Sequence, residues 1–313
     1  MSDAEIVQAI EILNLVTHFD VAASTLFVWD WLLTLRMEVE LVWKSKWNFM
    51  KVLYLAQRYL PFVDTIGLVI CHQLGINMAV STCQRVYYAS GYLIVVGFIL
   101  SELILTLRAW AVWNRDRLLM VVLSSLFVAL WSLDLAFITL FLRSVGFAPE
   151  PYAGFTGCFV IQANHFLMLC WVVLIAWDTI VLLVMLVAGY KAYKTGGPSA
   201  LLDVVYRDGI IYYFYVFVLS TINVIVVKTL PPEYEHLLTS TERCLHSVLT
   251  SRVLLDIRAY TVHRRRCWAD GLTDLEVTVD FEFKHEDPVE SLQMATVPVP
   301  QEEALSIKSA DVV

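Results

Sequence analysis

Long apolar runs separated by short polar stretches dominate the pattern of this chain. Crossing a bilayer takes a helix of about 20 mostly apolar residues. Four runs meet this requirement and contain at most two charged residues each, so they predict membrane-spanning helices: 86–112, 118–142, 158–190 and 208–229.

Three further runs are apolar but carry more charge: 20–42, 47–74 and 236–258. The second contains Pro61, which predicts a kink because proline removes a helical hydrogen bond. Each of the three can instead be a helix that lies in the membrane interface. Full crossings are favoured, because seven spans account best for the charges of the loops.

The composition supports a membrane protein. Apolar residues make up 58% of the 313 residues and charged residues 17%, whereas soluble domains contain about 25% charged residues. This excludes a cytosolic enzyme, a nucleic-acid-binding protein and a disulfide-dense secreted domain. The fold class predicted is all-α: a polytopic membrane protein of seven transmembrane helices, without an internal repeat.

The charges predict an orientation and three regions. With the N-terminus outside, fifteen of the basic residues near helix ends lie on the cytoplasmic side and three on the outside, as the positive-inside rule requires. We therefore expect an extracytoplasmic N-terminus (1–17), a transmembrane domain (18–260) and a cytoplasmic tail (261–313). From Cys267 onwards the tail has eleven acidic residues and two lysines, which predicts disorder.

One motif is familiar: VWDWLLTLRMEVELVWKSKWNFMKVLYLAQRYLPFVD, residues 28–64. It resembles the signature of a family of basidiomycete fungal membrane proteins catalogued as a domain of unknown function, although Trp29 and Trp31 stand where that signature more often has tyrosine. The resemblance implies a seven-helix membrane protein without an established activity. Further matching segments extend it over about residues 18–260: SELILTLRAWAVW (101–113), GCFV (157–160), YRDGIIYY (206–213), PPEY (231–234) and LHSVLTSRVLLDIR (245–258).

Charged residues within the predicted spans are the candidate functional residues, because burying a charge in a bilayer is costly. They can line a polar cavity for a ligand or relay protons, or they can pair with one another and lock helices together. Arg252 and Asp256 share a face of the last span, as do Glu242 and His246, and Asp30 is one possible partner of Arg58. The candidate cluster comprises Asp30, Arg58, Asp64, Glu102, Asp134, Asp178, Glu242, Arg252 and Asp256.

Two cysteines fall on the predicted outer face, where disulfides persist. Cys83 precedes the third span and Cys158 lies at the end of the loop before the fifth. A bridge between them would match the arrangement of G-protein-coupled seven-helix receptors. Alternatives are two free thiols, or pairing of either with Cys71.

A basic cluster follows the last span directly. Arg264, Arg265 and Arg266 favour contact with anionic lipid headgroups at the cytoplasmic face. The neighbouring Cys267 is a candidate palmitoylation site. The alternative is ordinary positive-inside residues beside a reduced thiol.

These features favour a receptor-like protein that binds a small or lipophilic ligand among its helices and contacts a cytoplasmic signalling partner, in the plasma membrane rather than an internal one. A proton-coupled transporter or channel and a structural scaffold are the alternatives. We expect no enzyme activity, because the chain lacks H-E-x-x-H and G-x-S-x-G motifs, although an intramembrane hydrolase stays open. We expect no metal, cofactor or nucleic acid; the lipid bilayer is the predicted partner.

Overall fold

The computed structural model describes residues 3–66, 69, 79–148, 158–162, 164, 166–194, 209–230, 234 and 236–269. The chain divides into two units, Met1–Arg265 and Arg266–Val313, and the helices of the first unit form a bundle.

Helices make up most of the described residues. Their bounds are α1 Asp3–Glu38, the π-helical η1 Val39–Trp43, α2 Phe49–Tyr59, α3 Pro61–Asp64, α5 Val80–Val112, α6 Arg117–Ser144, α7 Phe166–Lys194, α9 Gly209–Thr229 and α10 Thr239–Ala269. Two short strands, β1 Gly146–Ala148 and β2 Phe159–Gln162, pair antiparallel between α6 and α7.

Five stretches of helix are long and apolar enough to cross a membrane: Ile10–Trp43, Val80–Val112, Arg117–Ser144, Phe166–Lys191 and Ile210–Thr229. Their hydropathy, and the many large apolar side chains that they leave exposed, match a lipid environment. The protein is therefore a multi-span membrane protein.

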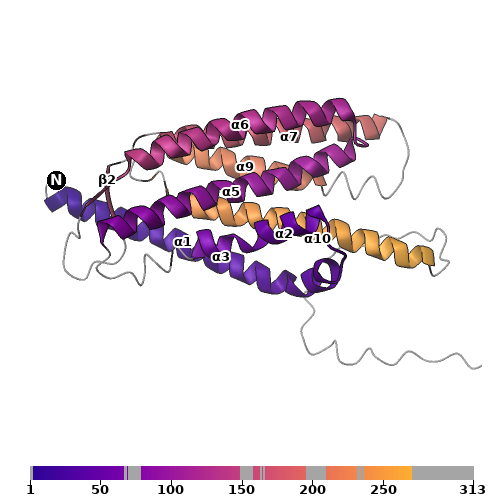
Figure 1. Cartoon of the computed structure of the whole chain (residues 1–313), viewed down its shortest axis with the longest axis horizontal. Helices are drawn as coiled ribbons and strands as arrows, with labels where there is room; N and C mark the ends of the chain where they lie inside the picture. Colours follow the sequence, from indigo (N-terminus) through magenta and orange to yellow (C-terminus); the bar gives the residue numbers. More distant parts are fainter. Residues whose placement is uncertain are drawn as a thin grey trace, which may run out of the picture. The chain divides into compact units, whose positions relative to one another are not determined.

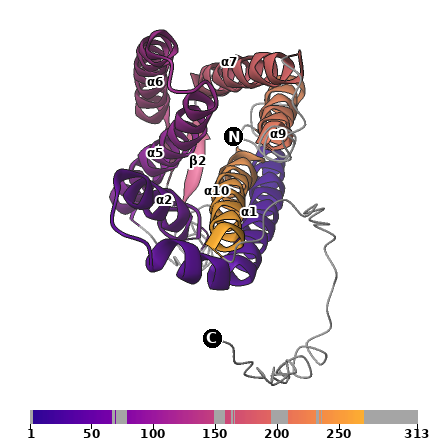
Figure 2. The same cartoon turned by 90° about the vertical axis from the view of Figure 1, so that its right-hand side faces the viewer.

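The long helices run side by side (Figure 1). Seen along the bundle, α6, α7 and α9 follow one another along one side, while α10 lies beside α1 with α2 and α5 on its other side (Figure 2). The N-terminal part of the polar α10 thus lies among other helices of the bundle, while its C-terminal part extends beyond them (Figure 1).

Several predicted boundaries need correction. The run 158–190 is not one helix: residues 159–162 form β2, whose apolar Phe-Val-Ile sequence pairs with β1, and α7 begins at Phe166. Helix α1 begins at Asp3, so residues 3–17 are helical and continuous with the first span. Helix α10 extends to Ala269 because no glycine or proline interrupts it, so the first residues of the predicted tail are helical; residues 270–313 lie outside the described part.

The second predicted span is interrupted at its proline. Helix α2 begins at the Asn48 cap, whose side chain accepts a hydrogen bond from the backbone N–H of Lys51, and it ends at Tyr59. Helix α3 begins at Pro61, which has no N–H to continue the ladder. The rest of the predicted run, to residue 74, lies largely outside the described residues.

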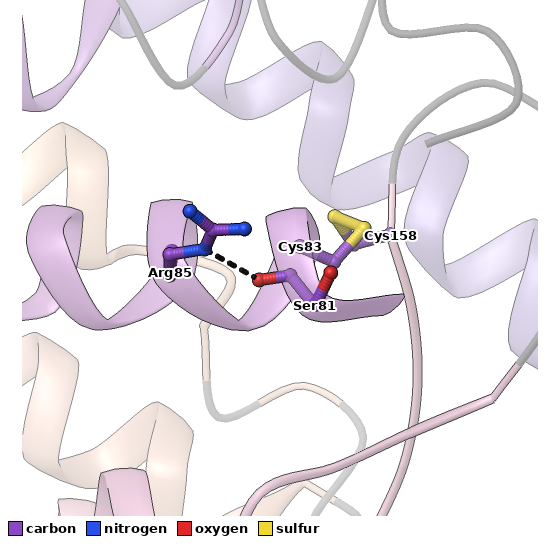
Figure 3. Close-up of a disulfide and its surroundings, with 4 residues drawn as sticks. All are labelled: Ser81, Cys83, Arg85 and Cys158. Atoms are coloured by element: carbon purple, nitrogen blue, oxygen red, sulfur yellow. Dashed lines mark hydrogen bonds between the residues drawn. A yellow bond between two sulfur atoms is a disulfide. The ribbon is translucent and has the colours of Figure 1, made fainter. Parts of the chain in front are cut away.

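A disulfide connects the first turn of α5 to the residue before β2. Cys83 and Cys158 are bonded, with Cα atoms 5.6 Å apart and 75 positions apart in sequence (Figure 3). This is the pairing that the sequence analysis favoured; Cys71 lies outside the described residues. The bond ties the residue before β2 to the start of α5.

Reducing this disulfide should lower the thermal unfolding temperature of the detergent-purified protein. Closing a loop of 75 residues stabilises a chain by up to about 4 kcal/mol in the chain-entropy model. The measurement is thermal unfolding with and without reductant. The Cys83→Ala/Cys158→Ala variant should unfold at the lower temperature and show no further response to reductant; an unchanged wild-type midpoint would contradict the prediction.

Candidate functional site

The first group of buried charges, here called the arginine cluster, comprises Asp30 and Glu38 of α1, Arg58 of α2 and Arg252 of α10. Arg58 places Nη1 3.1 Å from Asp30 Oδ2 and Nε 3.6 Å from Glu38 Oε2. Arg252 Nε lies 2.5 Å from Asp30 Oδ1. Two carboxylates therefore face two guanidinium groups, and the cluster is balanced in charge.

Neighbouring side chains add hydrogen bonds to the arginine cluster, although Glu38 Oε2 and Arg58 Nε form none with the described residues. Arg58 Nη2 donates to the hydroxyl of Thr34. Tyr59 and Trp43 donate to Glu38 Oε1 at 2.8 and 2.9 Å. Buried ion pairs are tolerated when such bonds satisfy them, so this cluster joins α1, α2 and α10 as a structural element.

A second set of polar contacts connects α10 to α2, α3 and α5. Arg243 Nε donates to Asp64 Oδ2 at 3.0 Å, and both side chains are fully buried. Gln57 donates to Ser101 at 3.2 Å and accepts from Ser251 at 3.3 Å. On α10 these contacts involve Arg243 and Ser251, which are both buried.

The third group, here called the carboxyl–histidine cluster, comprises Glu102 of α5, Asp178 of α7, and Glu242 and His246 of α10. His246 Nδ1 lies 3.3 Å from Glu102 Oε1, and His246 Nε2 lies 3.9 Å from Glu242 Oε1. Asp178 interacts electrostatically with Glu102 and His246. All four side chains are at least 96% buried, so three carboxyl groups meet one imidazole away from water.

Helix α9 contributes two neutral groups to this cluster. Ser220 donates to Asp178 Oδ2, and the Asn223 amide donates to Glu242 Oε2. On the apolar side, the Phe98 ring meets His246 edge-on with ring centroids 5.1 Å apart, and Trp171 meets Phe98 at 5.8 Å. Helices α5, α7, α9 and α10 therefore all converge here.

The carboxyl–histidine cluster is incompletely hydrogen-bonded. Of the buried polar atoms without a hydrogen-bond partner in the described part of the chain, six belong to this cluster and to Asn223: Glu102 Oε1, Asp178 Oδ1, Asn223 Oδ1, Glu242 Oε1, His246 Nδ1 and His246 Nε2. Others lie elsewhere, including Glu38 Oε2 and Arg58 Nε of the arginine cluster. Leaving a buried polar group unsatisfied costs about 1–3 kcal/mol, and more if it is charged. A set of such atoms in one place is typical of a site where a ligand or water binds rather than of packing alone.

The structure divides the predicted candidate residues into groups. Asp30, Arg58 and Arg252 belong to the arginine cluster; Glu102, Asp178 and Glu242 belong to the carboxyl–histidine cluster; Asp64 pairs with Arg243.

Asp134 and Asp256 lie apart from these groups. Asp134 is buried on α6, where its backbone carbonyl is 4.0 Å from the thiol of Cys170. Asp256 is exposed and accepts a hydrogen bond from Tyr212 at 2.9 Å. Arg252 and Asp256, which are four residues apart on α10, have different partners: Arg252 contacts Asp30 of α1 and Asp256 contacts Tyr212 of α9.

The basic cluster after the last span is helical, since Arg264–Cys267 belong to α10. The side chains of these four residues lie outside the described part, so lipid contact and palmitoylation stay predictions.

Sequence reasoning left Glu38, Gln57, Asn223, Arg243 and His246 out of the candidate cluster. Glu38 lies near the charged end of the first predicted span. Gln57 and Asn223 are neutral, so no charge distinguishes them within an apolar helix. The sequence does place His246 on one face with Glu242, and Arg243 could have been added from the same spacing, since it lies four residues before the buried Ser247.

Comparison with known proteins identifies a family for one part of the chain. Residues 18–63 match the model of a family of unknown function (DUF6533). No curated protein matches the chain. The match confirms the resemblance of the first motif to a family without an assigned activity, and it covers Asp30, Glu38 and Arg58 of the arginine cluster. Among the described residues, no group of three or more His, Cys, Asp or Glu could hold a metal ion.

Replacing Arg58 by methionine should destabilise the protein by about 3–5 kcal/mol, because it leaves buried carboxylates without their partner. The added change Glu38→Gln should recover part of this loss, since Asp30 then keeps Arg252 and the cluster is again neutral. Thermal unfolding in detergent measures both effects. Arg36→Ala is the matched control on α1: its pair with Glu40 is exposed, so stability should change little. Equal effects of Arg58→Met and Arg36→Ala would contradict the structural role.

Gly97→Ala should also be destabilising, by roughly 1–3 kcal/mol. A Cβ atom at Gly97 would overlap the guanidinium of Arg243, which is held by Asp64. At Gly91 the same substitution meets a movable end of Leu142 at 3.0 Å, and alanine is the better helix former. Thermal unfolding should therefore rank Gly97→Ala well below Gly91→Ala; the reverse order would contradict the packing of Arg243.

Proposed function

We propose that this multi-span membrane protein is a receptor-like bundle of seven membrane-spanning segments that binds a ligand among its helices. The carboxyl–histidine cluster carries this proposal, because its buried polar atoms lack partners where four helices meet. A ligand at this place would contact α5, α7, α9 and α10 at once. Its binding would thereby favour one arrangement of the helices over another, which is how a receptor responds.

The proposed seven segments comprise the five apolar spans, helix α10 and the interrupted helix formed by α2 and α3. Helix α10 has 31 residues and, at about 1.5 Å per residue, is long enough to cross. Most of its polar side chains between Ser240 and Ser251 are buried against other helices, so lipid need not solvate them. The charged residues Lys51, Arg58 and Asp64 of α2 and α3 are likewise buried, which supports a crossing by this interrupted helix.

The proposed orientation places the N-terminus outside and the C-terminus in the cytoplasm. The excess of basic residues at one set of helix ends supports it. The disulfide supports it as well, because Cys83 and Cys158 then lie on the oxidising face. The cytoplasmic ends of the helices and the acidic tail would contact a signalling partner, and the plasma membrane is the proposed location.

A proton-coupled transporter is the second candidate. The observation that favours it is the meeting of three carboxyl groups and a histidine inside the bundle, since such groups serve as proton relays in membrane transporters. The charge balance of the arginine cluster favours a scaffolding role for that cluster, which is compatible with either function.

Orientation is tested with epitope tags at both ends of the chain in expressing cells. An antibody should bind the N-terminal tag on intact cells and the C-terminal tag only after permeabilisation. A tag in the tight turn between α5 and α6, beside Arg115, should behave like the C-terminal tag. Access to the C-terminal tag on intact cells would contradict the proposed orientation.

The ligand-binding role is tested by thermal unfolding of the purified protein against a library of small molecules. A compound that binds within the helices should stabilise the wild type and lose this effect in Asn223→Ala, while Asn114→Ala, in the α5–α6 turn, should behave as the wild type. Accumulation of the same compound inside proteoliposomes would favour the transporter over the receptor. Stabilising compounds that are all insensitive to Asn223→Ala would contradict binding at this site.

A further inference from the structure

The two buried clusters differ in charge balance. In the arginine cluster, Arg58 and Arg252 face Asp30 and Glu38, so each carboxylate has a cation beside it. The carboxyl–histidine cluster holds three carboxyl groups, and its one basic group is His246. It therefore has an excess of acidic groups in a region where uncompensated charge is costly.

In the part of the chain that the structure describes, the nearest cations form no ion pair with the cluster, although Arg243 Nη1 and Nη2 and Arg108 Nη1 have no hydrogen-bond partner. Arg243, which neighbours His246 on α10, is held by Asp64 at 3.0 Å. Arg108 of α5 interacts with Tyr213 and Asp256. Neither guanidinium forms an ion pair with Glu102, Asp178 or Glu242 among the contacts of the described residues. A positive charge for these carboxyl groups must come from elsewhere.

Besides the two ring nitrogens of His246, four buried atoms of the cluster and of Asn223 have no hydrogen bond to any described residue, and all four are acceptors on different helices: Glu102 Oε1 on α5, Asp178 Oδ1 on α7, Asn223 Oδ1 on α9 and Glu242 Oε1 on α10. Glu102 Oε1 and Glu242 Oε1 face His246 at 3.3 and 3.9 Å. The Asn223 nitrogen donates to Glu242, and this hydrogen bond orients the amide. The amide oxygen has no hydrogen-bond partner among the described residues. A ligand that suits the site must bring hydrogen-bond donors and positive charge together.

We propose that the carboxyl–histidine cluster binds the ammonium group of a small primary amine. An ammonium group carries one positive charge and three N–H donors, and has no acceptor to oppose the carboxylates. Its hydrogen bonds to carboxylates are charge-assisted and stronger than neutral ones. Phe98, which contacts His246, and Trp171, which contacts Phe98, supply apolar surface for the hydrocarbon part of the amine. This inference rests on the proposed function, since it names the ligand class of the same site.

The test uses the full-length protein in detergent and a series of straight-chain primary amines together with phenethylamine. Thermal unfolding is followed as each amine is added at neutral pH, and the alcohol of the same chain length is the control for hydrophobic and detergent effects. The wild type should be stabilised in a saturable manner by at least one amine and not by its alcohol. Glu242→Gln and Asp178→Asn should weaken the apparent affinity by about tenfold or more.

Two matched variants keep the test specific. Asp134→Asn removes a buried carboxyl group outside the cluster, and Asp256→Asn removes an exposed one on α10; both should retain the amine response. All variants must keep the wild-type circular dichroism spectrum. If Glu242→Gln fails to fold, Asn223→Ala takes its place, since it removes a neutral acceptor.

The outcomes are distinct. Equal stabilisation by amines and alcohols, or an amine response that survives in all cluster variants, would overturn the amine site. So would the absence of any response to the amines. In that case the proposed function still stands if a neutral library compound stabilises the wild type and loses its effect in Asn223→Ala; it falls with the amine site if no compound depends on that residue.

Discussion

Pairing of charges away from water is the constraint on which the bundle depends. In a lipid environment an isolated charged side chain is costly, and the cost falls when an opposite charge and hydrogen bonds compensate it. Arg58 is fully buried and contacts Asp30, Glu38 and Thr34 of α1. Since these groups come from different helices, the helices must assemble in one arrangement for every charge to find its partner.

Helix α10 benefits most from this arrangement. By hydropathy it is the least suited to a bilayer, and it is absent from the five apolar spans. Its side chains Arg243, His246 and Arg252 nevertheless each find a partner on α3, α5 or α1. The polarity that would exclude α10 as an isolated helix is what holds it inside the bundle. The same helix carries Glu242, so it joins the balanced cluster to the acidic one.

The difference between these clusters connects structure to function. A balanced, hydrogen-bonded cluster stabilises the fold without any added group. Within the described structure, the carboxyl–histidine cluster has acceptors without a hydrogen bond and an excess of acidic groups, and with Asn223 it draws on four helices. Changes in its occupancy would therefore be transmitted to α5, α7, α9 and α10 together.

Much of the fold was predictable from the sequence, and the reasons for the failures are physical. Helices α6 and α9 begin and end within a few residues of their predicted bounds, because their apolar runs stop at charged residues. Strand β2 was missed because Phe159–Gln162 continues the apolar run of α7, and hydropathy does not distinguish strand from helix. Helix α1 was predicted too short, since its first turns are polar but helical.

The site was predictable in part. Buried charges such as Glu102 and Asp178 could be picked out because they interrupt apolar runs. Which of them meet depends on the rotation of each helix and on its neighbours, and no spacing within one helix determines that. Thus Arg58 and Asp30 could be named as one possible pair, whereas the pairing of Asp64 with Arg243 could not be derived.

The central claim is that α10 is enclosed by the bundle despite its polarity, and spin labelling tests it most directly. Single labels at Thr250 and Val253, both 1% exposed, are compared with labels at Val121 and Val128 of α6, which are 61% and 65% exposed. In lipid bilayers the α10 labels should be poorly accessible both to oxygen and to a water-soluble relaxation reagent, while the α6 labels should be accessible to oxygen. Strong relaxation of either α10 label by the water-soluble reagent would place the helix at the membrane interface and contradict the account.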